Sequence, residues 1–537
     1  MTAPLRAEVL FVEITTLILF IVKHIFQAKA CRRLGIMILS LDQGTTSSRA
    51  ILFDAEAEVI SQGQYEIKQS FPRPGWVEHD PEQIWESQLA AARDAIAASS
   101  VPADHITAIG ITNQRETALI WDKITGKPIY PAIVWQDRRT ADQCEELKAC
   151  GMAGVIADKT GLVIDAYFSA TKLAWILDHV PGARDRAAKG ELLAGTIDTW
   201  LIWKLTGGAI HATDVTNASR TMMYNLHERQ WDEELMDTLC IPPSILPEVR
   251  MSGGDFGVCD QQWFGLEIPI RSVLGDQQAA LFGHTCLEAG SAKNTYGTGC
   301  FILMNTGTEA VASSHGLLTT VAWGMGDELY YALEGSVFVA GAAVQWLQEG
   351  LGLIVAPADS EEKASEVDES EGVVVVPAFT GLGAPYWDMY ARGAIFGLTR
   401  GTTSAHLVRA TLESLAFQSR DVIDAMQKDA GMPLTGLRVD GGAVRNNLLM
   451  QFQADILGSE VTRTTYAETT ALGAALLAGL TSGVWTREQL ESFNTAEKVF
   501  SPQMEPEERE RRYGVWQDAV SRTMGWEKHE GKHEGRL

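Results

Sequence analysis

Residues 38–54, ILSLDQGTTSSRAILFD, decide the fold of this chain. A short apolar run ends at Asp42, Gly44 lets the backbone turn, and a second apolar run begins at Ile51. This pattern predicts a β-hairpin with a polar tip. Its hydroxyls, backbone N–H groups and Arg49 suit phosphate oxygens, and a carboxylate at a strand end can hold Mg²⁺. A plain turn without a ligand fits the same residues.

The size and charge of the chain narrow the class of protein. A length of 537 residues exceeds one hydrophobic core and predicts two domains of about 200 to 250 residues plus extensions. The net charge of -25 would repel nucleic acid and anionic membranes, so no nucleic-acid partner is expected. Any phosphate must then be held by nearby backbone amides, hydroxyls, a few Arg side chains and a divalent cation. The seven scattered cysteines contain no CxxC pair, which favours a cytoplasmic protein.

The two ends of the chain differ from the rest. In residues 1–36 the uninterrupted apolar run Ile14–Val22 is shorter than the ~20 residues that span a bilayer, so no stable membrane insertion is expected. Our hypothesis is that Met37 is the true first residue and that 1–36 is an extension outside the fold. The alternative is a weak membrane-surface anchor. From about residue 527 a polar tail repeats KHEG, and we expect it to be solvated.

A second unit begins much like the first. A strand-like run ends at Tyr296, Gly297-Thr298-Gly299 forms a turn, and a second run starts at Cys300. Two such hairpins about 250 residues apart suggest a duplicated domain, divided here as 37–285 and 286–537. The periodicity also predicts strands at 59–67, 106–112, 132–135 and 373–376, and helices at 81–98, 337–347, 403–426 and 446–457.

Three loops are candidates for a nucleotide site. The chain has no Walker A loop and no HExxH motif, so a nucleotide would need another scaffold. The segments 42–49 and 294–299 are polar hairpins, and 440–443 is a Gly-Gly turn between a strand and a helix. Each alone could be an ordinary turn. Together, the hairpins could clamp phosphates while the Gly-Gly turn admits a base or ribose.

Seven motifs carry a resemblance to a known family: LDQGTTSSR, GITNQRET, YFSATKLAW, GDQQAALFG, KNTYGTGC, GAIFGLTRG and VDGGAVRNN. Over about residues 37–481 the chain resembles the FGGY carbohydrate kinases, in particular those that act on glycerol. The resemblance implies an α/β fold of two actin-like, ribonuclease H-like domains with a catalytic cleft between them. It also implies ATP-dependent phosphorylation of glycerol to sn-glycerol 3-phosphate, with Mg²⁺, by a homo-oligomer (dimer or tetramer).

The expected polyol site centres on Arg115 and Glu116. Arginine only donates hydrogen bonds and an ionised glutamate only accepts them, so the pair matches hydroxyls that do both. Taken alone, such a pair is more often a surface ion pair. The resemblance adds three polar groups and two apolar walls to this site: Tyr167, Asp276, Gln277, Trp135 and Phe301.

Asp276 is the expected general base. A hydroxyl that attacks phosphorus must lose its proton, and a carboxylate within hydrogen-bond reach can accept it. Asp276 could instead cap a helix that begins at Gln277, and the two roles are compatible.

The resemblance also assigns the nucleotide side. Asp42 would help to place Mg²⁺ through water. The phosphates would be held by Thr45, Thr46, Ser47, Arg49 and Thr298. The adenosine side would be lined by Gly341, Gln345, Gly442 and Asn446.

One segment departs from the family pattern. Relatives that fructose 1,6-bisphosphate regulates carry a basic, Gly-rich loop, whereas Met251–Ile270 contains no Lys or Arg and includes Asp260 and Glu267. We therefore expect no inhibition by this bisphosphate. Two other functions fit the sequence: an FGGY kinase for another small polyol or sugar, and a non-metabolic actin-like ATPase.

Overall fold

The computed structural model describes residues 35–466 and 468–527. The hypotheses on the N-terminal extension and on the KHEG repeats concern residues that lie almost wholly outside this range. Within it, no helix combines the length and the apolar character needed to cross a membrane.

The predicted hairpin is confirmed and forms the centre of a six-stranded sheet. Its two strands pair antiparallel with Asp42 opposite Arg49, and a third strand extends the antiparallel edge. On the other side two further strands run parallel to the first. The order is β13-β14-β5-β1-β2-β3, with bounds β1 (Met37–Gln43), β2 (Ser47–Phe53), β3 (Val59–Glu66), β5 (Ile106–Asn113), β13 (Val258–Cys259) and β14 (Ile268–Gly275).

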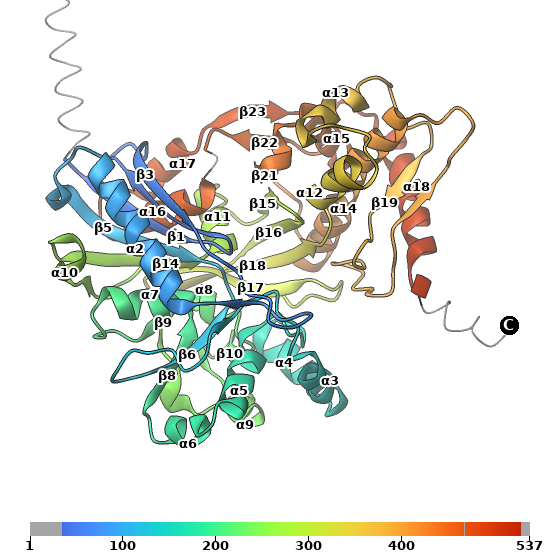
Figure 1. The fold of residues 1–537 in the computed structure, drawn as a ribbon. Coiled ribbons are helices and arrows are strands. Elements are labelled where there is room, and N and C mark those ends of the chain that lie inside the picture. Colours follow the sequence, from blue (N-terminus) through green and yellow to red (C-terminus); the bar gives the residue numbers. More distant parts are fainter. Residues whose placement is uncertain (1–34, 467, 528–537) are drawn as a thin grey trace, which may run out of the picture.

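The second half of the chain repeats this arrangement. Two strands form a hairpin, a third extends it antiparallel, and two later strands add in parallel on the other side. The shared succession confirms two domains of the actin-like, ribonuclease H-like type (Figure 1). The order is β17-β18-β16-β15-β21-β22-β23, with bounds β15 (Ser291–Tyr296), β16 (Cys300–Gly307), β17 (Leu318–Met325), β18 (Glu328–Val337), β21 (Gly436–Gly441), β22 (Val461–Thr464) and β23 (Ala496–Phe500).

The first domain carries an additional lobe, at the bottom of Figure 1. It contains a small sheet of β4 (Glu78–His79), β7 (Ala132–Ile133), β6 (Ala118–Asp122) and β8 (Leu192–Thr196). Its helices include α3 (Ala141–Ala149), α4 (Met152–Thr160), α5 (Ser169–His179), α6 (Ala183–Ala188) and α9 (Glu233–Thr238), whereas α7 (Ile197–Leu205) packs into the core of the first sheet.

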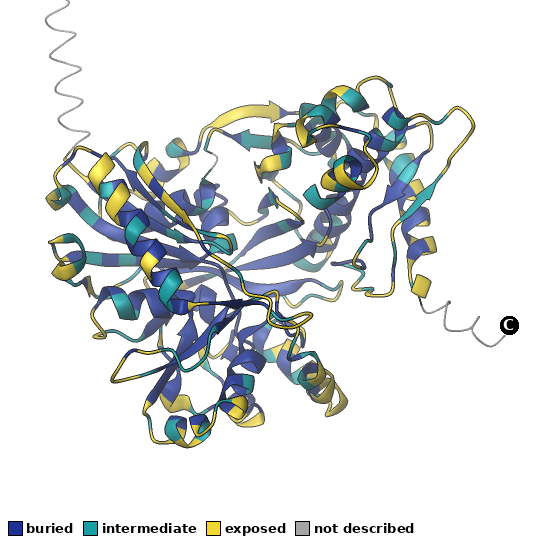
Figure 2. Ribbon diagram, in the orientation of Figure 1, coloured by how far each residue is buried: buried dark blue, intermediate teal, exposed yellow. Residues whose placement is uncertain are grey.

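Most predicted helices form with their apolar faces inward. In α2 (Pro81–Ala98) Asp80 accepts a hydrogen bond from the Glu82 N–H, and Pro81 suits the first turn. Ile84 and Ala92 on its inner side pack into the first core, and the central strands in Figure 2 are buried. The second domain is covered by α14 (Ser404–Ala430), α15 (Asn447–Leu457) and α18 (Pro506–Thr523).

The helix predicted at 337–347 is wrong at its start. Val337 is the last residue of β18, and α12 spans only Gly341–Gln345 before a π-helical turn at Trp346–Gly350. The apolar run suits a buried strand as well as a helix. The tip of the second hairpin fixes where the helix begins, because the Gly341 N–H donates to the Gly297 carbonyl (3.0 Å). The residues before Gly341 therefore stay outside the helix.

Two helices cross between the domains. α11 (Asp276–Gly283) follows the first sheet in sequence, and α16 (Thr469–Thr481) belongs to the second half but packs on the first sheet. Ser40 and Ser272 of that sheet donate to backbone carbonyls of α16, each over 2.7 Å. At the crossing, a Cβ on Gly473 would lie 1.8 Å from the Ala279 carbonyl oxygen. The contact therefore requires glycine.

Candidate active site

Three parallel strands deliver their following loops to one edge of the first sheet. In the register of β1, β5 and β14, Asn113 lies beside both Gln43 and Gly275. Because the carboxyl ends of parallel strands meet at the same edge, the Arg115-Glu116 loop and Asp276 emerge close to Asp42. The sheet thus brings together residues that are up to 234 positions apart in the chain, Asp42 and Asp276.

The predicted polyol residues are in contact. The Arg115 Nε lies 3.3 Å from Asp276 Oδ1 and 3.6 Å from Glu116 Oε1, and its Nη2 is 3.4 Å from the Tyr167 hydroxyl. Arg115 and Glu116 are buried, so they are not the surface pair that the sequence also allowed. Gly275 leaves room for this arrangement, because a Cβ there would lie 2.7 Å from the Arg115 side chain.

Aromatic side chains join this group to the phosphate hairpin. The rings of Trp135 and Tyr167 lie edge to face with centroids 5.7 Å apart. The Trp135 indole N–H donates to the Thr45 hydroxyl over 3.0 Å. A predicted apolar wall therefore connects the polyol residues to the first predicted phosphate residue.

The carboxylates at the sheet edge have raised pKa values. Burial raises the pKa of Asp42 to about 6, against the opposing charge of Arg49, and Asp276 raises it further. Burial also raises the pKa of Asp276, against the charges of Arg115 and Lys293. A buried carboxylate with too little positive compensation suits a divalent cation, and one carboxylate plus water and phosphate oxygens is a donor set that Mg²⁺ accepts. Asp42 thus fits its predicted role.

Two backbone hydrogen bonds fix the tip of the first hairpin. The Gly44 N–H donates to the Ser47 carbonyl and the Ile67 N–H to the Thr46 carbonyl, each over 2.9 Å. These bonds occupy backbone carbonyl oxygens and leave the Thr46 hydroxyl available for a phosphate. Arg49 forms an ion pair with Glu468, just before α16, so a phosphate would share or replace that partner.

In the second domain the tip residue Thr298 fixes the start of α12. Its carbonyl accepts from the Ala340 N–H (2.8 Å) and the Ala342 N–H (3.1 Å). Gly341 approaches so closely that a Cβ would lie 2.5 Å from the Gly297 oxygen. The structure therefore brings Thr298 and Gly341 together.

The other predicted adenosine residues lie around neighbouring loops. Gly441, with φ +96°, packs its backbone on Tyr296 and carries the chain into the exposed Gly442. Asn446 caps α15 by accepting from the Leu449 N–H (2.8 Å), and Gln345 on α12 donates to Glu349 (2.9 Å). Among the described residues, no hydrogen bond or ion pair joins Gln345 to Asn446, and no ring contact joins Phe301 of β16 to Tyr167 or Trp135.

Asp276 is the first residue of α11, and Gly275 occupies the N-cap position. The capping alternative is therefore wrong in its detail, although Asp276 Oδ1 does accept from the Gln277 N–H (2.7 Å). The Gln277 side chain accepts from Lys293, which also donates to the Thr295 hydroxyl (3.0 Å).

Sequence reasoning missed three buried charges beside the site: Arg220, Lys293 and Glu334. Glu334 accepts from Arg115 Nη1 (2.6 Å) and Nη2 (3.0 Å), and from Arg220 Nη2 (3.0 Å). The available signal was position for Glu334, which interrupts the largely apolar strand β18, whereas Lys293 lies among polar residues of β15. A charge at such a place needs a buried partner.

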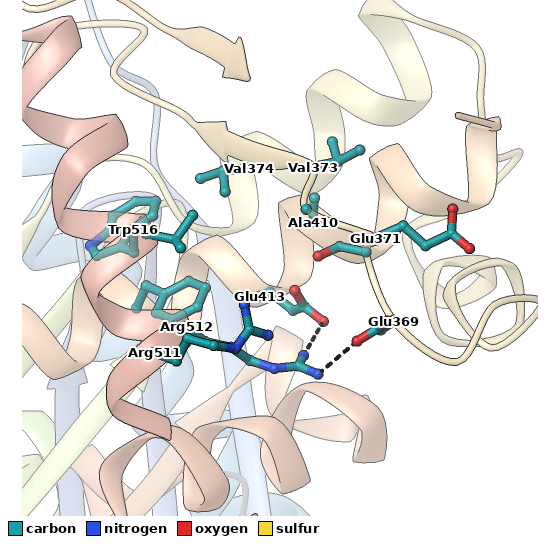
Figure 3. Close-up of a pocket in the computed structure, with 13 residues that line it drawn as sticks. Glu369, Glu371, Val373, Val374, Ala410, Glu413, Arg511, Arg512 and Trp516 are labelled. Carbon is teal, nitrogen blue, oxygen red and sulfur yellow. Dashed lines mark hydrogen bonds and ion pairs between the residues drawn. The ribbon is translucent and has the colours of Figure 1, made fainter. Parts of the chain in front are cut away.

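The pocket of about 80 Å³ in Figure 3 is a different place. It lies in the second domain between α14, α18 and the segment before β19 (Val374–Val376), and no predicted site residue lines it. Its charges are paired, since Arg512 contacts Glu369 (3.0 Å), Glu413 (4.0 Å) and Glu508 (2.6 Å). The candidate active site is therefore the edge of the first sheet.

Comparison with known proteins gives a consistent result. Residues 37–283 match the N-terminal domain, and 292–482 the C-terminal domain, of the FGGY family of carbohydrate kinases. The chain is 59% identical to glycerol kinase 2 of Thermotoga maritima over 91% of its length and 99% of that protein. It is 58% identical to a glycerol kinase of Salmonella arizonae, covering 92% and 99%.

Among solved structures, the chain is similar to Plasmodium falciparum glycerol kinase with ADP. The TM-score is 0.87 at 39% identity, with 91% of this chain and 98% of that chain covered. A xylulose kinase from Lactobacillus acidophilus has a TM-score of 0.81 at 22% identity, which shows a shared fold.

Proposed function

Because the chain belongs to the FGGY family of carbohydrate kinases, we propose that it transfers the γ-phosphoryl group of ATP to a terminal hydroxyl of glycerol, giving sn-glycerol 3-phosphate and ADP. The observation that carries the proposal is the contact of the buried Arg115 with Glu116, Tyr167 and Asp276 at one edge of the first sheet. The glycerol kinases to which the chain is similar supply the choice of polyol.

The polyol residues would orient glycerol by matching donors to acceptors. Arg115 donates to hydroxyl oxygens and Glu116 accepts from hydroxyl hydrogens, so each of two hydroxyls can be held in a defined direction. Trp135 and Phe301 would contact the carbon chain. The third hydroxyl is left facing Asp276.

Asp276 then acts as the general base. As the hydroxyl oxygen bonds to phosphorus, its proton passes to the Asp276 carboxylate, and the bond between the γ-phosphorus and the bridging oxygen breaks to release ADP. The raised pKa of Asp276 makes its carboxylate a stronger base than an exposed one.

The phosphate side would work by positioning and charge compensation. Thr45, Thr46, Ser47 and Thr298 offer hydroxyls and N–H groups from the two hairpins. Mg²⁺, held through water by Asp42, would neutralise phosphate charge. Closure of the domains would exclude water, which competes with glycerol as an acceptor.

The cysteines bear on where the reaction takes place. The six described cysteines are free thiols, which supports a cytoplasmic enzyme. The homo-oligomer predicted from the sequence stays a prediction.

The test uses the full-length protein and compares several phosphoryl acceptors. ADP release is measured with glycerol, erythritol, xylulose and no acceptor, and the glycerol product is identified by phosphorus NMR. We expect glycerol to give the highest kcat/KM. Faster turnover of xylulose or erythritol would favour another FGGY kinase activity, and equal ADP release without an acceptor would favour an ATPase.

A further inference from the structure

Four buried charges form a closed ring beside the polyol site. Arg115 donates to Glu334 through both Nη atoms, Glu334 accepts from Arg220 Nη2, and Arg220 Nε donates to Glu116 Oε1 over 2.7 Å. Glu116 closes the ring, 3.6 Å from Arg115 Nε. Each side chain is at most 2% exposed. We name Arg115, Glu334, Arg220 and Glu116 the charge ring.

The charge ring crosses the domain boundary. Arg115, Glu116 and Arg220 belong to the first domain, whereas Glu334 lies on β18, where it pairs with Leu303 and Leu318 of the neighbouring strands. Its backbone is therefore fixed by the second sheet. The carboxylate reaches from that sheet into the loop that carries the polyol residues.

Glu334 determines the direction of the Arg115 guanidinium. A carboxylate that accepts from both terminal nitrogens fixes the plane of the guanidinium as well as its position. With Nη1 and Nη2 committed to Glu334, Nε is directed toward Glu116 and Asp276. Glu116 has a positive φ of 60°, an unfavourable backbone conformation that needs support, and Arg220 supplies it.

We propose that Glu334 is a positioning residue of the polyol site: from the second domain it holds Arg115, and through Arg220 it holds Glu116, in the orientation that receives glycerol. Glu334 would not touch glycerol itself. This inference rests on the proposed function, because it takes Arg115 and Glu116 as the residues that bind the polyol.

Two substitutions of Glu334 test the proposal in the full-length protein. Glu334→Gln keeps the shape but loses the charge and one acceptor. Glu334→Asp keeps the charge but withdraws the carboxylate by one methylene, so it also decides the question where Gln prevents folding. We expect kcat/KM for glycerol to fall about 10- to 100-fold in either variant, the range for a lost hydrogen bond to a charged group. ADP affinity, measured by calorimetry, should change less than about twofold.

The control is Glu413→Gln. Glu413 is a second buried glutamate of the same domain, on α14, and is paired with Arg409 over 3.0 Å. We expect this variant to lose thermal stability while kcat/KM for glycerol stays at the parent value. This control thus distinguishes the general effect of removing a buried charge from the effect of changing the charge ring.

A double-mutant cycle with Arg115→Lys tests whether Glu334 acts through Arg115. If it does, Glu334→Asp should cost less than about threefold in kcat/KM once a lysine ammonium has taken the place of the forked guanidinium. Additive losses of kcat/KM in the double variant would overturn the proposal. So would a folded Glu334→Asp variant with the kcat/KM of the parent, or equal losses of glycerol and ADP binding. If the parent protein does not phosphorylate glycerol, the proposed function itself fails, and that result is read before any variant.

Discussion

At the scale of single residues, the candidate site groups its charges close to neutrality. Three positive side chains, Arg115, Arg220 and Lys293, are grouped with three carboxylates, Glu116, Asp276 and Glu334. Asp42 lies at the edge of this group, and its pKa is raised to about 6. A cation beside Asp42 would complete the compensation.

Replacing Asp276 with Asn removes the proposed proton acceptor and keeps its shape. We expect kcat with glycerol to fall about 10²- to 10⁴-fold, the usual contribution of a general base. ADP affinity should stay close to that of the parent, because the residues predicted to hold the nucleotide do not include Asp276. Steady-state kinetics and calorimetry check the two parts, and unchanged turnover would remove Asp276 from this role.

Asp429, near the end of α14, ties a loop of the second domain to that helix. Burial disfavours its charge, but hydrogen bonds from Ser313, His315 and Ser314 outweigh burial and lower its pKa to about 2. A carboxyl whose pKa is lower in the folded protein contributes stability above the ordinary pKa near 4, and this contribution is lost as the pH falls toward 2.

Asp429→Asn should therefore lower the free energy of unfolding by about 1 to 3 kcal/mol at pH 7. The difference in unfolding free energy between variant and parent should shrink as the pH falls from 5 to 3. Urea denaturation at each pH measures it. Asp518→Asn, at an exposed position of α18, is the control. A deficit that stays constant with pH would contradict the assignment.

At the scale of elements, the close crossing of α11 and α16 joins the two domains. α16 is buried along most of its length and packs on the first sheet, so the order of elements in the chain differs from their order in space. Small residues make the crossing possible, because Gly473 faces the backbone of α11. Side chains larger than hydrogen would separate the helices.

Gly473→Ala should lower the free energy of unfolding by about 1 to 3 kcal/mol through overpacking. The matched control is Gly514→Ala in α18, where nothing lies within 4 Å of the added Cβ. That substitution should raise stability by about 0.5 to 1 kcal/mol, since alanine favours a helix more than glycine does. Urea denaturation of both variants checks the pair, and equal effects would show that the crossing has room.

At the scale of the whole molecule, the two sheets share one topology but hold different parts of the site. The first domain holds most of the predicted polyol residues and one hairpin. The second holds Phe301, the other hairpin and the loops predicted for adenosine. The substrate would therefore span both domains. Glu334 links the predicted polyol loop to the second sheet across the boundary.

The segment 251–270 bears on regulation of the whole enzyme. Its flanking arginines already bind the segment, since Arg271 contacts the Asp255 carboxylate (2.7 Å) and Arg250 donates to the Asp255 carbonyl (2.7 Å). Binding a bisphosphate here would require positive charge that is not free. We expect fructose 1,6-bisphosphate to leave initial rates unchanged up to millimolar concentration, and inhibition at micromolar concentration would refute this.

The sequence by itself determined the fold class and predicted most residues of the candidate site. The Gly/Thr hairpins, the apolar strand segments just before Asp42 and Asp276, and the helix signals at Asp80 and Pro81 are local patterns with local physical causes. Such patterns can be read without knowing which segments meet. They also carry the family resemblance, which supplied the roles of Tyr167 and Trp135.

Only the tertiary structure decided which charges share a site. Glu334 is 219 positions from Arg115, and its neighbours in the chain show that it needs a partner but not which residue that partner is. The end of β18 at Val337 also depended on a hairpin that is distant in the chain. The packing of α16 likewise depended on strands of the first sheet, far from it in sequence. The physical reason is common to all three: a buried polar group or a close backbone contact takes its partner from whatever the fold places beside it, and that partner has no fixed distance along the chain.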